Sequence, residues 1–194
     1  MTKQNDIFYN DKFINTYSRI CNDVATEKGW WDGEPKSYEA CLTLIYSELY
    51  EFYEALREDN INNNFKIFNP YFNQEFFKKE DIPDIKESEE NYLLAQFRTN
   101  CKSSGEVELA DMIIRCLDWW GQYPALVRKP LPKANLNESI HKEMLKAMDR
   151  QTINYLYSFA VELANIYNIS LLTPFNLKIS YNKTRNYKHG NKKF

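Results

Sequence analysis

Apolar residues recur at helical spacing along most of the chain. Between Ser37 and Glu58 they fall at positions 42, 45, 49, 52 and 56, which places them on one stripe of an α-helix. Ser37 is a suitable N-terminal cap, because a serine hydroxyl accepts a hydrogen bond from a free backbone N–H of the first turn. The stripe therefore predicts a helix with one buried face.

Other segments show the same period, separated by glycines, prolines or polar clusters. Residues 28–35 contain two glycines and a proline, and they separate the first helix from the second. We expect helices at 6–26, 37–58, 86–100, 106–120, 136–150 and 151–167, and a short one at 171–181. The pattern predicts one all-α domain over residues 1–194.

The segment from about 60 to 104 differs from its neighbours. It is rich in Asn, Phe, Lys and Glu, and it contains Asn-Pro and Ile-Pro dipeptides that interrupt helices. We interpret it as a partly helical insertion between two strong helices. A basic C-terminal tail, residues 178–194, completes the domain.

Composition agrees with a helical protein. Of 194 residues, 43% are hydrophobic, and the five glycines are few for a β-sandwich or a phosphate-binding glycine loop. The four cysteines form no C-x-x-C pair, and the chain has no signal peptide or membrane-spanning run, so we expect free thiols, a cytoplasmic protein and no membrane contact. The net charge of −2 argues against a protein that coats nucleic acid.

The charges are unevenly placed along the chain. Five acids stand between Glu48 and Asp59, whereas six Lys or Arg and no acid stand between Lys178 and Phe194. An acidic centre and a basic end suit a protein that binds a metal ion together with a phosphate chain. Two solvated segments would give the same distribution.

The first acidic helix offers one pair of candidate metal ligands. Glu48 and Glu51 lie one turn apart on the flank of the apolar stripe, whereas Glu54 and Glu58 point further toward solvent. Two carboxylates in this arrangement reach one cation while the stripe packs inward.

The second pair, Glu108 and Asp111, begins a helix whose apolar residues cover most of its circumference. Buried carboxylates persist only when they are paired, protonated or bound to metal. Oxygen ligands without cysteine or histidine select hard cations, so we expect Mg²⁺, with Mn²⁺ as a substitute. The structural alternative is an acidic first turn that complements the helix dipole.

Three blocks, in this order, resemble the MazG-like family of all-α nucleoside triphosphate pyrophosphohydrolases. Residues 47–57 are similar to the family's E-x-x-E helix, and residues 108–118 to its E-x-x-D helix. Residues 181–192, with the sequence YNKTRNYKHGNK, are similar to its basic C-terminal end. The segment 28–31, KGWW, also resembles one that precedes the first motif in some members.

The resemblance implies a helical bundle that forms a homodimer or homotetramer and hydrolyses a (d)NTP to the (d)NMP and pyrophosphate. By motif position, the Mg²⁺ ligands would be Glu48, Glu51, Glu108 and Asp111. Glu48 or Glu51 would also orient the attacking water. The substrate-binding residues would be Lys178, Asn182, Arg185, Lys188 and, stacked on the base, Trp31 or its neighbour Trp30.

The chain departs from the family pattern in two main places. The spacing between Glu51 and Glu108 is much longer than in the family's compact hairpin, which leaves residues 60–104 outside the template. Residues 122–151 also exceed what a minimal member needs. In addition, Asn186 stands where the family often has proline.

Two other interpretations remain open at the level of sequence. Glu138-x-x-His141 is the ligand unit of di-iron helical bundles, but that architecture needs two such units, and the other histidine is His189. Alternatively, the protein binds a nucleotide or a protein partner without turnover. The sequence leaves the preferred base and sugar undetermined.

Overall fold

The computed structural model describes residues 5–33, 35–61, 87–126, 131 and 134–188. In this part of the chain every regular element is a helix, and short 3-10 helices occur at Asp6–Tyr9 and Pro124–Leu126. The α-helices are α1 (Asp11–Glu27), α2 (Tyr38–Arg57), α3 (Glu87–Asn100), α4 (Gly105–Gln122), α5 (Ile140–Arg150), α6 (Ile153–Ile166) and α7 (Leu172–Lys183). The predicted all-α class is therefore confirmed for the described residues. None of these helices meets the length and hydropathy needed to span a membrane.

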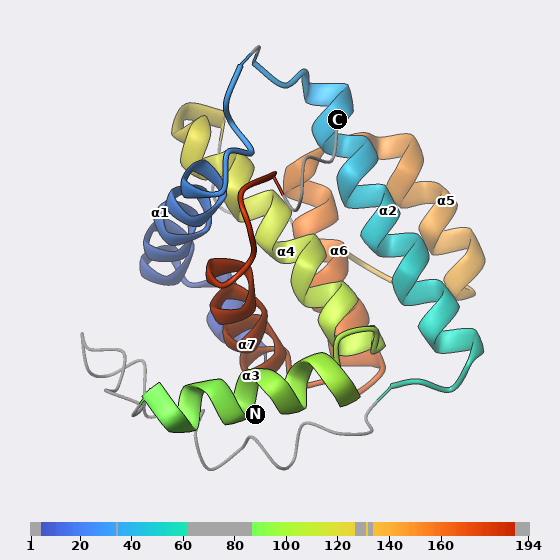
Figure 1. Ribbon diagram of the computed structural model, residues 1–194. Coiled ribbons are helices and arrows are strands. Elements are labelled where there is room, and N and C mark those ends of the chain that lie inside the picture. The colour runs from blue at the N-terminus through green and yellow to red at the C-terminus, as the bar shows by residue number, and fades with distance from the viewer. Residues whose placement is uncertain (1–4, 34, 62–86, 127–130, 132–133, 189–194) are drawn as a thin grey trace.

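Helix α4 is the centre of the molecule. It packs against α1, α2, α6 and α7, as Figure 1 shows. Its residues Leu109, Ala110, Met112 and Ile113 are fully buried. The near-continuous apolar sequence of α4 follows from this position, because a helix enclosed on most sides leaves little surface for polar residues.

Helix α2 has the N-terminal cap and the buried apolar stripe that its sequence predicts. The Ser37 hydroxyl accepts a hydrogen bond of 3.1 Å from the backbone N–H of Ala40, which confirms the predicted cap. Ile45, Leu49 and Phe52 of the apolar stripe are at most 1% exposed, and they face α4. The same orientation brings the flanking Glu48 toward α4.

Some predicted boundaries are wrong. The expected first helix is a 3-10 turn followed by α1, because Asn10 adopts extended backbone and its side chain caps α1 by accepting from Lys12 and Phe13. Helix α5 begins at Ile140 and not at 136. Helix α7 continues to Lys183, so the first part of the predicted tail is helical. Within the predicted insertion, residues 62–86 lie outside the described residues.

Helix α3 has a small core of its own. Leu93 and Phe97 pack with Cys101, Val107 and Leu177, and so join α3 to the start of α4 and to α7. All four cysteines of the chain are buried and free, as expected for reduced thiols.

Candidate metal centre and adjoining pocket

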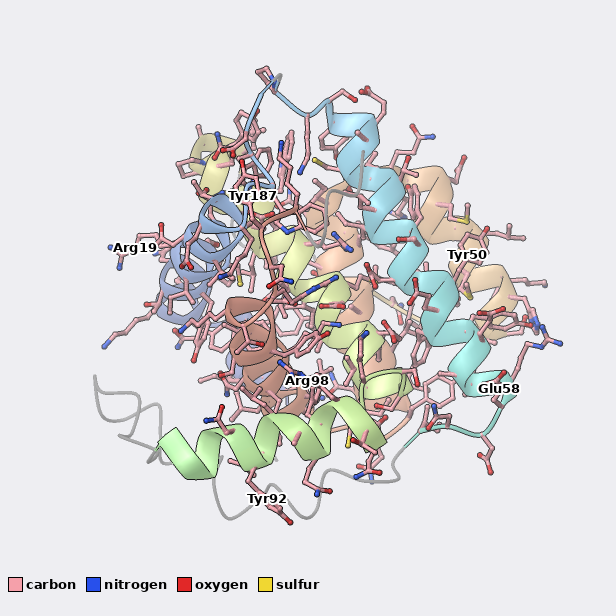
Figure 2. All side chains as sticks on the ribbon, viewed as in Figure 1. Arg19, Tyr50, Glu58, Tyr92, Arg98 and Tyr187 are labelled. Atoms are coloured by element: carbon pink, nitrogen blue, oxygen red, sulfur yellow. The ribbon has the colours of Figure 1, made fainter. Side chains whose placement is uncertain are left out.

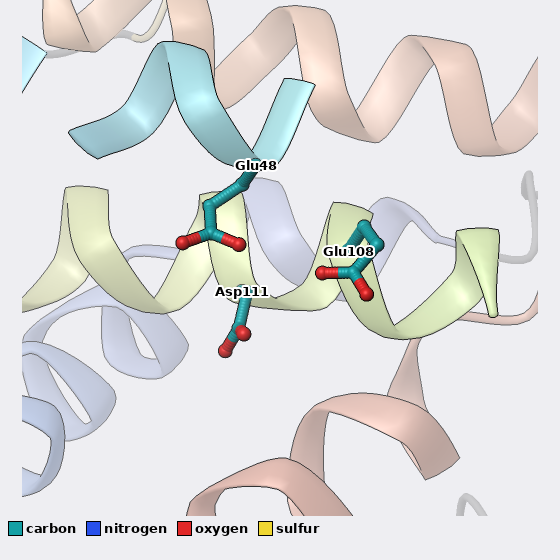
Figure 3. Close-up of side chains that lie close together, drawn as sticks. All are labelled: Glu48, Glu108 and Asp111. Atoms are coloured by element: carbon teal, nitrogen blue, oxygen red, sulfur yellow. The ribbon is translucent and has the colours of Figure 1, made fainter. Parts of the chain in front are cut away.

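Three of the four predicted metal ligands meet between α2 and α4. Glu48, Glu108 and Asp111 each offer a carboxylate oxygen within 4.8 Å of the others. They are buried, with exposed fractions of 4%, 5% and 9% respectively. Figure 3 shows Glu108 and Asp111 one turn apart on α4, with Glu48 reaching across from α2. We call this group the carboxylate cluster.

Two cations contact the carboxylate cluster. Nε and Nη2 of Arg115 both lie 2.5 Å from Glu48 Oε1. Nζ of Lys178 lies 2.5 Å from Asp111 Oδ2. Within the described part of the chain Glu108 forms no ion pair, so three buried carboxylates share two cations.

Burial changes the proton affinity of the Glu108 carboxyl. Burial, and next the charge of Asp111, raise the pKa of Glu108 from 4.5 to about 9, although Lys178 opposes this shift. Burial also raises the pKa of Glu48, despite the opposing effect of Arg115. The surroundings of Glu108 therefore favour its protonated form, and a bound cation would oppose this shift.

The donor set of the carboxylate cluster fits a hard divalent cation. Its ligand atoms are all oxygens, and an added positive charge would remove the need for a proton on Glu108. Among the described residues, no other group of three or more His, Cys, Asp or Glu has the geometry to hold a metal ion. A purely structural ion-pair network would leave one carboxylate without a partner.

Glu51, the fourth predicted ligand, lies outside the carboxylate cluster. Its side chain is exposed on α2. Its charge nevertheless raises the pKa of both Glu48 and Glu108, so it stands at the edge of the same site. The structure thus brings together three of the four predicted ligands and leaves Glu51 at the rim.

A pocket opens directly beside the carboxylate cluster, with Asp111 in its lining. Its apolar lining includes the indole rings of Trp30, Trp31 and Trp119. Nζ of Lys36 lies over the first two rings, 4.9 and 5.1 Å from their centroids. Aromatic rings beside a cation suit a flat, partly anionic ligand.

Trp31 is held in place by Asp118 of α4. Its indole Nε1 donates a hydrogen bond of 2.7 Å to Asp118 Oδ1, which also accepts one of 3.0 Å from Asn22. Burial raises the pKa of Asp118 to about 6, although both hydrogen bonds oppose the shift. Asp118 is a site residue that was not predicted from the sequence. A signal was present, since residues 111, 115 and 118 recur at the spacing of one helical face.

Four of the five predicted substrate residues lie at the pocket or at the carboxylate cluster. Trp31, Asn182 and Arg185 line the pocket, and Lys178 contacts the carboxylate cluster through Asp111. Lys188 is not among the lining residues. Its backbone N–H donates a hydrogen bond of 2.8 Å to Lys28 O, which fastens the end of the described chain to the segment after α1.

Tyr187 completes this attachment. Its hydroxyl bonds to the Asp32 carboxylate, and its ring lies against Gly29, where an added Cβ would stand 2.4 Å from Tyr187 Cε2. Gly29 also has a φ of +75°, which L side chains rarely adopt. Tyr187 and Lys188, at the end of the described chain, are therefore in contact with the segment that follows α1.

The di-iron alternative finds no support in the described residues. Glu138 is paired with Lys142 and Lys146 at 3.3 and 2.9 Å. Nε2 of His141 lies 2.6 Å from the hydroxyl of Tyr53. These two side chains thus have ordinary surface partners, and they belong to no group of candidate metal ligands.

Comparison of the chain with protein-family models, curated proteins and solved structures gave no match.

Proposed function

We propose that this protein is a Mg²⁺-dependent nucleotide pyrophosphohydrolase that cleaves a (d)NTP to the (d)NMP and pyrophosphate. The observation that carries the proposal is the contact between two features. The buried carboxylate cluster, in which Glu108 has no ion-pair partner among the described residues, borders a pocket of indole rings and cations through Asp111. The proposal includes a MazG-like bundle, to which the three sequence blocks are similar.

The bound metal would neutralise phosphate charge and lower the pKa of a water molecule. Glu48, Glu108 and Asp111 would hold it, and Mn²⁺ would serve as a substitute because it prefers the same oxygen donors. Glu51 stands at the rim of this site, where its carboxylate is available to orient the attacking water and accept its proton.

The remaining residues of the pocket would bind the nucleotide. The rings of Trp30 and Trp31 would hold the base, and the hydrogen bond from Trp31 to Asp118 fixes the second ring in place. Arg185 would donate to phosphate oxygens with its two-pronged guanidinium. Attack of water on the α-phosphorus forms a new P–O bond there, breaks the bond to the bridging oxygen and releases pyrophosphate.

We also propose an oligomeric state and a cellular location for the protein. Tyr50 of α2 and Leu145 of α5 are 50% and 67% exposed, and the Tyr50 hydroxyl lies 3.5 Å from Met148 Sδ of α5. Exposed apolar side chains on neighbouring helices support a homodimer or homotetramer. A cytoplasmic location agrees with the four free cysteines.

The alternative is a nucleotide-binding member of the same fold without turnover. A panel of (d)NTPs incubated with Mg²⁺ separates the two, with nucleoside monophosphate and pyrophosphate as the products measured. We expect turnover of at least one nucleotide, and a loss of about 100-fold or more in Glu51→Gln if this residue handles the water proton. Glu54→Gln, on the exposed side of the same helix, is the matched control. Nucleotide binding without pyrophosphate release would favour the alternative.

A further inference from the structure

Four cations surround the ring of Tyr181 on α7. The charged groups of Arg98, Lys102, Lys178 and Arg185 lie 5.3, 5.7, 5.9 and 5.8 Å from its centroid. Two of them, Arg98 and Lys102, come from α3 and the turn that follows it. We call these four residues the basic cluster.

The basic cluster is continuous with the proposed active site. Lys178 belongs to it and also contacts Asp111 of the carboxylate cluster at 2.5 Å. Arg185 belongs to it and lines the aromatic pocket. Because α4 starts only five residues after α3 ends, Arg98 and Lys102 stand toward the Glu108 end of α4, whereas Trp119 marks the pocket end.

Contacts between α3 and α7 hold Arg98 in place. Phe97 packs against Tyr181 with ring centroids 5.6 Å apart. Nη2 of Arg98 donates a hydrogen bond of 2.9 Å to the hydroxyl of Thr184, just after α7. Figure 2 shows Arg98 on the side of α3 that faces α7. Among the described residues, Arg98, Lys102 and Arg185 form no ion pair with an acid, whereas Lys178 is paired with Asp111.

We infer that Arg98 and Lys102 bind the terminal phosphates of the nucleotide and, after cleavage, the pyrophosphate product. This inference rests on the proposed function for the identity of the ligand. A base among the indole rings and an α-phosphate at the carboxylate cluster would direct the β- and γ-phosphates toward the basic cluster. Arginine binds phosphate with two parallel hydrogen bonds, and lysine adds a point charge. The segment that the resemblance leaves outside the template thus contributes to the substrate site.

Binding of inorganic pyrophosphate in the presence of Mg²⁺, measured by calorimetry on the full chain, tests the inference. We expect Arg98→Ala to weaken binding about tenfold or more, and Lys102→Ala to weaken it less, because lysine makes the less directional contact. Arg98→Lys should fall between wild type and Arg98→Ala. Arg19→Ala is the control, since Arg19 is an exposed arginine on the outer side of α1.

The outcomes separate this inference from the proposed function. Unchanged pyrophosphate affinity in folded Arg98→Ala, with nucleotide turnover present, would overturn the phosphate site and leave the enzyme standing. A pyrophosphate site that depends on Arg98, in a protein that hydrolyses no nucleotide, would retain the site and reject the enzyme. Circular dichroism of Arg98→Lys guards against a folding defect, because this variant keeps the charge and most of the side-chain volume.

Discussion

The protonation of Glu108 determines how the carboxylate cluster responds to pH. Arg115 neutralises Glu48, and Lys178 neutralises Asp111, whereas Glu108 has no such partner among the described residues. A raised carboxyl pKa means that folding favours the protonated form. In the absence of metal, the contribution of Glu108 to the free energy of unfolding is therefore greatest below pH 4.5 and is lost as the pH rises through about 9.

The same shift predicts a pH dependence of metal binding. Mg²⁺ must displace the proton of Glu108 at any pH below about 9, so its affinity should increase by up to about tenfold per pH unit between pH 6.5 and pH 8.5. Calorimetry at these two pH values measures the change. The dependence should weaken sharply in Glu108→Gln, and an equal Mg²⁺ affinity at both pH values in wild type would contradict the account.

The burial of individual residues could be predicted from the sequence where helical spacing determines which side chains face the core. Glu108 and Asp111 lie one turn apart on an almost wholly apolar helix, so their burial follows from the pattern. The position of Glu51 could not be predicted from helical spacing alone. The packing of α4 against α2, which is set by the folded structure, buries Glu48 and leaves Glu51 at the rim of the site. Asp118 was missed because its partner Trp31 belongs to an irregular segment whose path has no periodicity.

At the scale of elements, the approach of α1 to α4 depends on Gly121. A Cβ at this position would stand 2.3 Å from the backbone oxygen of Ser18 and 2.4 Å from Asn22 Cβ. Backbone atoms cannot move aside as the end of a flexible side chain does. The two helices are therefore this close only because one residue lacks a side chain.

The close contact of Gly121 with α1 predicts that a larger residue at this position destabilises the protein. In an unobstructed helix, replacing glycine with alanine would stabilise the protein by up to about 1 kcal/mol. In Gly121→Ala the steric clash should prevail and lower the free energy of unfolding by about 1–3 kcal/mol, measured by denaturant titration. Glu54→Ala, at an exposed site on α2, should change it by less than about 0.5 kcal/mol. A Gly121→Ala protein as stable as wild type would refute the close contact.

The helices themselves were largely predictable, and their ends were less so. The apolar stripe of α2 and its cap at Ser37 were both read correctly from the sequence. The last two residues of α7, Asn182 and Lys183, were not predicted to be helical. Both are polar and neither is fully buried, so they add nothing to a hydrophobic pattern.

At the scale of the whole molecule, the carboxylate cluster joins separate helices. Glu48 comes from α2, Glu108 and Asp111 come from the central α4, and Lys178 connects α7 to the same point. A cation bound there would bridge α2 and α4. Metal binding should therefore be coupled to the stability of the fold.

We expect Mg²⁺ to raise the melting temperature of the wild type by about 5–10 °C at a hundredfold excess over its dissociation constant. EDTA should reverse the effect. Differential scanning calorimetry of wild type and Asp111→Asn measures it, with Glu54→Gln as the control that keeps the response. A melting curve of the wild type that is insensitive to Mg²⁺ would count against a preformed site.

The central claim is that Glu48, Glu108 and Asp111 form a divalent metal site. The most direct test is the anomalous scattering of Mn²⁺ in crystals of the protein grown or soaked with this ion. We predict an anomalous peak within about 2.0–2.6 Å of carboxylate oxygens from both α2 and α4. Crystals that contain Mn²⁺ elsewhere but show no peak at the carboxylate cluster, with Arg115 and Lys178 still paired as they are here, would contradict it.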